Sequence, residues 1–242
     1  MDIQLITPEI FPINDIICGV TTKNISYENP YGLSFSEGIR FDSQNVSIAK
    51  AMLANYLGIN VEAMKFQNQV HGKHIQIVDF STGYNDSDGL ITDLPLLVLN
   101  AKLADCGGIL VFDPVHRAIA AIHSGWKGTA LNIATAGIEK LFEQYSSNPV
   151  DLLAYITPSA GGENYEVEED VAKNFPNTTK YIGNSKYLFD IKKEIHQQLI
   201  RAGLLSHHIE VSKECTIANE NLHSFRREGD NSGRMSAFIM MR

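Results

Sequence analysis

The chain has 242 residues, of which 44% are hydrophobic, enough to fill the core of one compact domain, and we expect residues 1–242 to form a single domain. Its net charge of −8 argues against a general nucleic-acid binder, which needs a basic face, but is compatible with a small-molecule ligand. The first residues carry neither a signal peptide nor a membrane-spanning run, and the three cysteines are far apart, so we expect a cytoplasmic protein without disulfides.

Three segments have the apolar spacing of amphipathic helices. In the first, apolar residues recur at helical spacing between Ser43, a start signal, and Gly58, a stop signal. The second is expected over 131–145 with Thr129 as its cap, and the third over 191–202. The apolar faces of these helices are most simply explained as core.

Short apolar runs between the helices predict strands near residues 74–78, 96–101, 108–112, 118–122 and 152–156. The sequence DPVH at 113–116 is a turn candidate that would join the third and fourth runs in a hairpin. This hairpin would place Cys106 before its first strand and His123 after its second, so both side chains would emerge at one end of a sheet.

His71, Cys106 and His123 are metal donors on short glycine-bearing stretches, where the backbone can bend tightly. An ion held by three protein donors keeps one position for water or substrate, which is typical of a catalytic site. The donors are far apart in sequence, unlike those of compact zinc modules, so an accidental trio with Cys106 as a small buried hydrophobe stays open.

Four motifs, taken together, resemble those of one family. They are NQVHG, which contains His71, ADC, which ends at Cys106, HSGWKG, which begins at His123, and SFRREGDNSGRMS, which begins at Ser224. With these motifs spread over nearly the whole chain, the sequence resembles the YfiH-like, laccase-domain proteins, also called the multicopper polyphenol oxidase or purine nucleoside phosphorylase family. The resemblance implies an α+β fold in which mixed β-sheets pack together with flanking helices.

The resemblance also implies that His71, Cys106 and His123 bind a metal, usually zinc. It further implies that the site cleaves purine nucleosides such as adenosine or inosine with phosphate, by attack at ribose C1′, and adenosine deamination at the same site is an added possibility. Asp105, beside a ligand, is a candidate for fixing a histidine tautomer or for general acid–base catalysis, and a plain strand-end hydrogen-bonding role is equally open. We therefore expect a nucleoside and phosphate as ligands, and no feature specifies an oligomeric state.

Phosphate requires cations, and the candidates are Lys50, Lys127, Arg226, Arg227 and Arg234. In the family, as aligned here, arginines usually stand where Lys50 and Lys127 stand, so a point charge replaces a planar two-bond fork. This departure predicts weaker phosphate binding or a shift toward hydrolysis.

A second departure is the sequence GGENYEV, where related chains often carry a cysteine pair at the positions of Glu163 and Asn164. A polar wall in place of thiols would change which small molecule fits. Trp126 and Phe225 are candidates for stacking on a purine, although core packing is favoured for both.

Three other functions compete with a phosphorylase. The first is a zinc or cysteine amidohydrolase acting on a small amide, in which Cys106 and a histidine serve as nucleophile and base. A copper-dependent polyphenol oxidase is less favoured, because a multicopper cluster needs more histidines than three donors supply. A binding protein with a structural zinc would need a fourth protein donor.

Overall fold

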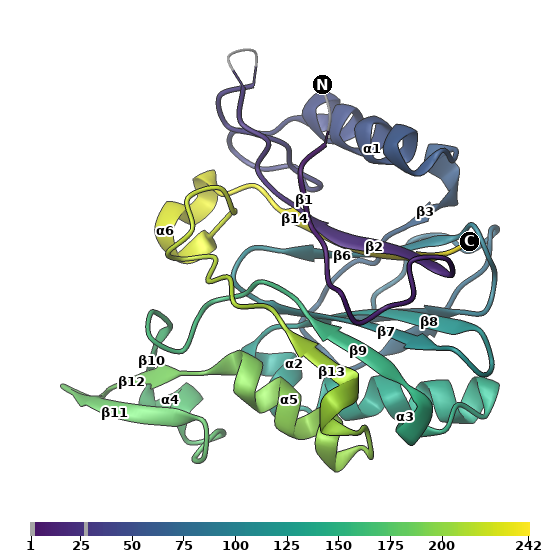
Figure 1. The fold of residues 1–242 in the computed structure, drawn as a ribbon. Coiled ribbons are helices and arrows are strands. Elements are labelled where there is room, and N and C mark those ends of the chain that lie inside the picture. The colour runs from purple at the N-terminus through teal and green to yellow at the C-terminus, as the bar shows by residue number, and fades with distance from the viewer. Residues whose placement is uncertain (1–2, 27–28) are drawn as a thin grey trace.

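Two β-sheets lie face to face and carry helices on their outer faces (Figure 1). The structure is a computed structural model, and it describes residues 3–26 and 29–242. The five-stranded sheet contains, in spatial order, β1 Leu5–Ile6, β2 Ile16–Thr21, β14 Met235–Met241, β6 Val98–Leu103 and β3 Met64–Lys65. The six-stranded sheet contains β13 Ile209–Val211, β9 Leu153–Ile156, β7 Gly107–Asp113, β8 Ala118–Ser124, β5 Gly89–Thr92 and β4 Ile75–Ile77.

Helices cover both outer faces. On the five-stranded sheet lies α1 (Ser43–Leu57), and on the six-stranded sheet lie α2 (Trp126–Ala130), α3 (Ile133–Tyr145) and α5 (Ile191–Arg201). A smaller sheet extends to one side and contains β10 (Glu166–Glu168), β12 (Lys186–Phe189) and β11 (Thr179–Gly183). The short helices are α4 Glu169–Ala172, α6 Phe225–Glu228, and the 3-10 turns η1 Val61–Ala63, η2 Pro149–Asp151, η3 Ser206–His208 and η4 Gly229–Asn231.

Strand β7 shows how the sequence specifies these layers. All of its residues are buried, and alternate side chains point to opposite faces of the sheet. Ile109 and Val111 pack under the helices, whereas Leu110 and Phe112 pack against the five-stranded sheet. A strand covered on both faces is expected to be continuously apolar, and β7 is.

The predicted hairpin is confirmed. Strands β7 and β8 pair antiparallel from Gly107 opposite Ser124 to Asp113 opposite Ala118. At the turn, Asp113 Oδ1 accepts hydrogen bonds from the backbone N–H groups of Val115 and His116. The predicted α+β class, with mixed sheets and flanking helices, is also confirmed, because parallel and antiparallel pairs occur in both large sheets.

The first and third helices follow the prediction, and the second differs. Helix α1 begins after a capping box at Asp42 and ends at Gly58, which has a φ of 68° that suits glycine. Thr129 is not a cap, because it lies inside α2, and α3 begins after Asn132, whose φ of 58° breaks the helix in two. Within α3, Phe142, which was predicted to lie on the apolar face, is 58% exposed, whereas Ile138 and Leu141 are buried.

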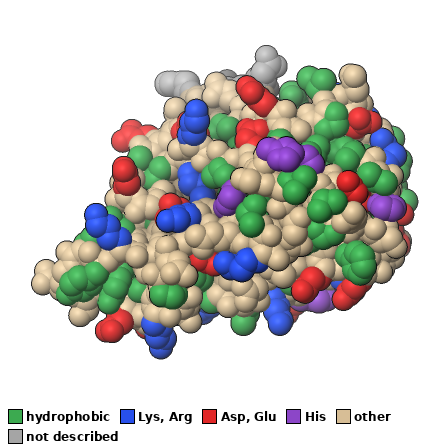
Figure 2. Space-filling view, turned by 60° about the horizontal axis from the view of Figure 1, so that its bottom comes forward, with side chains coloured by type: hydrophobic (Ala, Val, Ile, Leu, Met, Phe, Trp, Pro, Cys, Tyr) green, Lys and Arg blue, Asp and Glu red, His purple; other side chains and the backbone are tan. Residues whose placement is uncertain are grey.

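On the face drawn in Figure 2, acidic and basic side chains are interspersed and do not form a continuous basic area. None of the helices within residues 3–26 and 29–242 has the length and apolar character needed to cross a bilayer.

Candidate metal centre

One end of the six-stranded sheet and one loop bring His71, Cys106 and His123 together. Cys106 directly precedes β7, His123 is the penultimate residue of β8, and His71 lies on the loop before β4 with a φ of 59°. Because Gly108 pairs with His123 across the hairpin, the cysteine and this histidine lie at the same end of the sheet. One ligand atom from each of the three residues lies within 4.8 Å of the other two.

Gly125 leaves room for the three donors. A Cβ atom on this residue would lie 3.0 Å from Cys106 Sγ, 3.5 Å from His71 Cδ2 and 3.6 Å from His123 Cε1. The first of these distances is tighter than almost all natural Cβ contacts. The glycine of HSGWKG is therefore required by the close approach of the donors and not by its backbone angles, since its φ is −74°.

The buried carboxylate of Asp88 holds both histidines in place. Its Oδ1 accepts a hydrogen bond from His123 Nδ1 at 2.8 Å and another from the backbone N–H of His71 at 3.0 Å. Its Oδ2 accepts one from the backbone N–H of Gly72 at 2.6 Å. Since Nδ1 of His123 is thus occupied, Nε2 is the nitrogen that remains for a metal, which is the usual arrangement of a carboxylate behind a metal-binding histidine.

The charged groups of the site change one another's pKa values. Burial alone would lower the pKa of His123, but the charges of Cys106 and Asp88 raise it to about 9. Burial, the neighbouring His123 and the charge of Lys127 lower the pKa of His71. Burial alone would raise the pKa of Asp88, yet hydrogen bonds from His123 and Gly72 outweigh that effect and lower it.

The donors fit a single divalent ion. One thiolate sulfur and two imidazole nitrogens are ligands that zinc accepts, and three of them leave a coordination position open. The three side chains line a cavity of about 430 Å³, so the open position would face a space for a small molecule. Lys102, Arg234 and Phe225 also line this cavity.

Asp105 does not contact either histidine. It has a φ of 84°, and its carboxylate accepts hydrogen bonds from Thr216 Oγ1 and from the backbone N–H of Arg226, both at 2.6 Å. The tautomer-fixing role considered for Asp105 therefore belongs to Asp88, a residue that the sequence analysis missed. Asp88 lies in the polar stretch NDSDG, which resembles a surface turn, and only its position directly before an apolar strand hints at burial.

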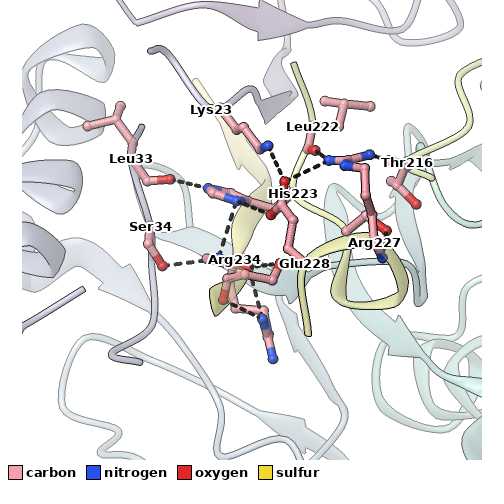
Figure 3. A network of polar contacts seen from close by, with 12 residues as sticks. Lys23, Leu33, Ser34, Thr216, Leu222, His223, Arg227, Glu228 and Arg234 are labelled. Atoms are coloured by element: carbon pink, nitrogen blue, oxygen red, sulfur yellow. Dashed lines mark hydrogen bonds and ion pairs between the residues drawn. The ribbon is translucent and has the colours of Figure 1, made fainter. Parts of the chain in front are cut away.

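Arg227 contacts backbone carbonyls and a carboxylate (Figure 3). Its guanidinium donates to the backbone carbonyls of Thr216, Ile217 and Leu222 at 2.6, 2.9 and 2.5 Å, and to Glu228 at 2.9 Å. These contacts hold together the loop that precedes α6 and argue against phosphate binding by Arg227, which stays a prediction.

The other predicted cations lie in different places. The exposed Lys127 is close enough to lower the pKa of His71, and the exposed Arg226 donates to the Glu166 carbonyl and lies over the Tyr165 ring. Lys50 lies 4.8 Å from the centre of the Phe66 ring. Lys50, Lys127 and Arg226 are not among the residues that line the cavity. Arg234 and Lys102 do line it.

The two aromatic candidates differ from each other. Trp126 is partly buried and packs against the core under the helices, as favoured. Phe225 is 47% exposed and lines the cavity, so the core assignment is wrong for this residue.

Comparison with known proteins places these features in a family. The family model described as multi-copper polyphenol oxidoreductase laccase matches residues 17–242. Similar proteins include the purine nucleoside phosphorylase YlmD of Bacillus subtilis, 28% identical over 94% of this chain and 89% of the relative, and a purine nucleoside phosphorylase of Deinococcus radiodurans, 32% identical over 82% and 78%. The crystal structure of the hypothetical protein YfiH from Bacillus licheniformis is 30% identical, covers 94% of this chain and 93% of its own, and superposes with a TM-score of 0.88.

Proposed function

The chain belongs to the multi-copper polyphenol oxidoreductase laccase family, and on that premise we propose that it is a zinc-dependent purine nucleoside phosphorylase acting on adenosine, inosine or related nucleosides. The observation that carries the proposal is the convergence of His71, Cys106 and His123 at a cavity that also holds cations and an exposed aromatic ring. The reaction class is inferred from the names of the relatives. The cavity contains groups that could bind a nucleoside and an anion, namely an aromatic ring and cations.

In the proposed reaction a phosphate oxygen bonds to ribose C1′ while the bond from C1′ to the purine nitrogen breaks, and its electron pair leaves with the purine, which takes up a proton. His71, Cys106 and His123 would hold the zinc ion, which when bound supplies a positive centre that orients and polarises an oxygen ligand. Asp88 keeps the His123 ring in position. Phe225 offers an aromatic surface for the base.

Zinc is favoured over a multicopper cluster. Among the described residues only one group of three ligand atoms converges, which suffices for one ion. We place the reaction in the cytoplasm, where reducing conditions keep the three free cysteines as thiols and Cys106 available as a ligand.

A second candidate is a cysteine amidohydrolase. One observation favours it: His123 contacts Cys106 on one side and Asp88 on the other. A thiol, an imidazole and a carboxylate are arranged in the same order in enzymes with a cysteine nucleophile. In that function Cys106 would attack an amide carbon, and His123 would pass a proton to the leaving amine.

The purified protein would be incubated with inosine or adenosine, with and without phosphate, while purine base, ribose 1-phosphate, ribose and ammonia are measured. Phosphate-dependent formation of ribose 1-phosphate supports the proposal, and free ribose formed at equal rates in both conditions contradicts it. Ammonia from adenosine would add deamination at the same site.

His71→Ala and metal removal separate the two candidates, because His71 is a ligand in the first candidate only, whereas His123 has a role in both. Loss of bound zinc and of phosphorolysis together supports the metal-dependent function. Activity that survives metal removal but is abolished by Cys106→Ala supports the cysteine nucleophile instead.

A further inference from the structure

We propose that Lys102 and Arg234 form an oxyanion subsite beside the metal ligands and that the guest of this subsite is a phosphate group. The subsite stands on the cavity and its lining alone. Only the identification of that phosphate as the attacking one in the reaction rests on the proposed function.

The sheet places the two cations on the same side. Lys102 pairs directly with Ser236 across β6 and β14, and Arg234 lies two residues before Ser236. Alternate residues of a strand share a face, so the side chains of Lys102 and Arg234 project in the same direction at the end of the sheet. Both line the cavity that contains the metal ligands.

The backbone beneath Lys102 is fixed by Gln69. The side-chain amide of Gln69 donates to the Lys102 carbonyl at 2.9 Å and accepts from the Lys102 backbone N–H at 2.8 Å. Strand β3 pairs with β6 only as far as Leu99, and Gln69 makes the backbone hydrogen bonds that a longer β3 would make to Lys102. The backbone of Lys102 is therefore held in place. Gln69 also belongs to the segment that carries His71, which couples the cation to the metal site.

Arg234 is anchored on one side and open on the other. Its NH1, seen in Figure 3, donates to the carbonyls of Ser232 and Gly233 at 3.0 and 2.9 Å. Its guanidinium lies 5.6 Å from the centre of the Phe225 ring. No described residue accepts a hydrogen bond from its Nε or NH2 atoms. These donors are available for a planar, two-bond contact with a phosphate.

The charges of this region favour an anionic guest. No Asp or Glu lines the cavity, and within the described chain neither Lys102 nor Arg234 forms an ion pair, although the charges of Cys106, Asp105 and Asp230 act on Arg234 and offset part of the positive charge. Burial and the nearby charges of Lys50 and Arg234 lower the pKa of Lys102. Cations that repel one another in a partly enclosed space are stabilised by an anion that contacts two of them.

Titration calorimetry with inorganic phosphate, AMP and adenosine tests the subsite without requiring turnover. We expect Lys102→Met to raise the Kd of phosphate, of AMP or of both by roughly 10-fold or more, the loss of one charge-assisted hydrogen bond, and to leave adenosine binding unchanged. Lys102→Arg should restore most of the affinity. If Lys102→Met raises the Kd of AMP alone, the phosphate in the subsite is part of the substrate. If it raises the Kd of inorganic phosphate, the phosphate enters the subsite as a free ion.

Two comparison variants sharpen the test. Lys127→Met removes the exposed cation near His71 that the sequence favoured, and Lys140→Met removes a surface lysine of α3 that pairs with Glu143 at 3.2 Å. Neither should change the affinity of phosphate or AMP as Lys102→Met does. The melting temperature of Lys102→Met should equal or exceed that of the unmodified protein, because the variant removes a repelled, half-buried charge.

The inference is overturned if the unmodified protein binds neither phosphate nor AMP, if Lys102→Met binds both as tightly as the unmodified protein, or if Lys127→Met or Lys140→Met is equally impaired. Phosphorolysis together with phosphate and AMP binding that does not depend on Lys102 would leave the proposed function standing and remove the subsite. Lys102-dependent phosphate binding without phosphorolysis would do the reverse.

Discussion

Asp88 Oδ1 lies 2.8 Å from Nδ1 of His123, and neither side chain is exposed by more than 2%. The same carboxylate accepts the backbone N–H groups of His71 and Gly72, so one buried group orients ligands from two separate segments. A metal-binding site whose ligands are held in this way is preorganised before the ion arrives.

Asp88→Asn should weaken zinc binding by roughly 10- to 100-fold, because an amide cannot accept from His123 and the two backbone groups with the strength of a carboxylate. Competition with a chelator of known affinity measures the effect. Asp113→Asn is the matched control, since Asp113 is also fully buried and contacts a histidine Nδ1 at 2.9 Å, but at the far end of the hairpin. Equal loss of zinc affinity in both variants would contradict an orienting role for Asp88.

Gly125→Ala should lower zinc affinity by about 10-fold, because its Cβ would lie 3.0 Å from Cys106 Sγ and would force the donors apart. Zinc content after dialysis and chelator competition report the change. Gly83→Ala is the control, since nothing lies within 4 Å of a Cβ at that position. Unchanged affinity in Gly125→Ala would show that the site tolerates the methyl group.

Arg227→Lys should lower the free energy of unfolding by about 2 kcal/mol, and the melting temperature by roughly 4–8 °C, because lysine cannot reach several carbonyls at once. Arg226→Lys should have a smaller effect, since Arg226 is exposed and donates to one carbonyl. Both variants should bind phosphate as the unmodified protein does. A specific loss of phosphate affinity in Arg227→Lys would restore the role that the sequence suggested.

Glu228→Gln should lower stability at neutral pH by an amount that disappears in acid. Burial alone would raise the pKa of Glu228, but contacts with His223, Lys23 and Arg227 hold it well below the ordinary value of 4.5 (Figure 3). A carboxylate with a lowered pKa contributes stability that is present above the ordinary pKa and is lost as the pH falls below it. The difference between the melting temperatures of the variant and the unmodified protein should therefore start to narrow as the pH falls below about 4.5, and should close only as the pH approaches the lowered pKa of Glu228.

A difference between the two melting temperatures that stays constant with pH would contradict the stabilising role of the Glu228 carboxylate. Glu143→Gln is the control, because its carboxylate is 63% exposed and its ion pair with Lys140 should contribute little.

The three candidate metal ligands could be singled out from sequence because each lies on a recognisable glycine-bearing motif and two of them flank one hairpin. The hairpin itself was predictable from two apolar runs and a short turn. Asp88 could not be identified in the same way, because it lies in a polar stretch that resembles an exposed loop. Its burial depends on the parallel pairing of β4 with β5, and no local sequence pattern indicates that pairing.

The cations show the opposite error. Lys102 was not among the predicted cations, and only its pairing with Ser236 places it at the cavity. Arg227 was included because sequence gives no sign that its donors are occupied by backbone carbonyls of a neighbouring loop. Charge is visible in a sequence, whereas the partner of that charge is a property of the tertiary structure.

The hairpin also affects the order in which the centre assembles during folding. Its two strands are joined by a short turn, so closing that loop costs little entropy, and Cys106 and His123 meet early. His71 and Asp88 arrive only when a parallel pair has been registered across a longer loop, which is slower. Under the proposed zinc-dependent function, we expect a chain that refolds in the presence of zinc to bind the ion first through Cys106 and His123, and His71 to complete the ligand set later.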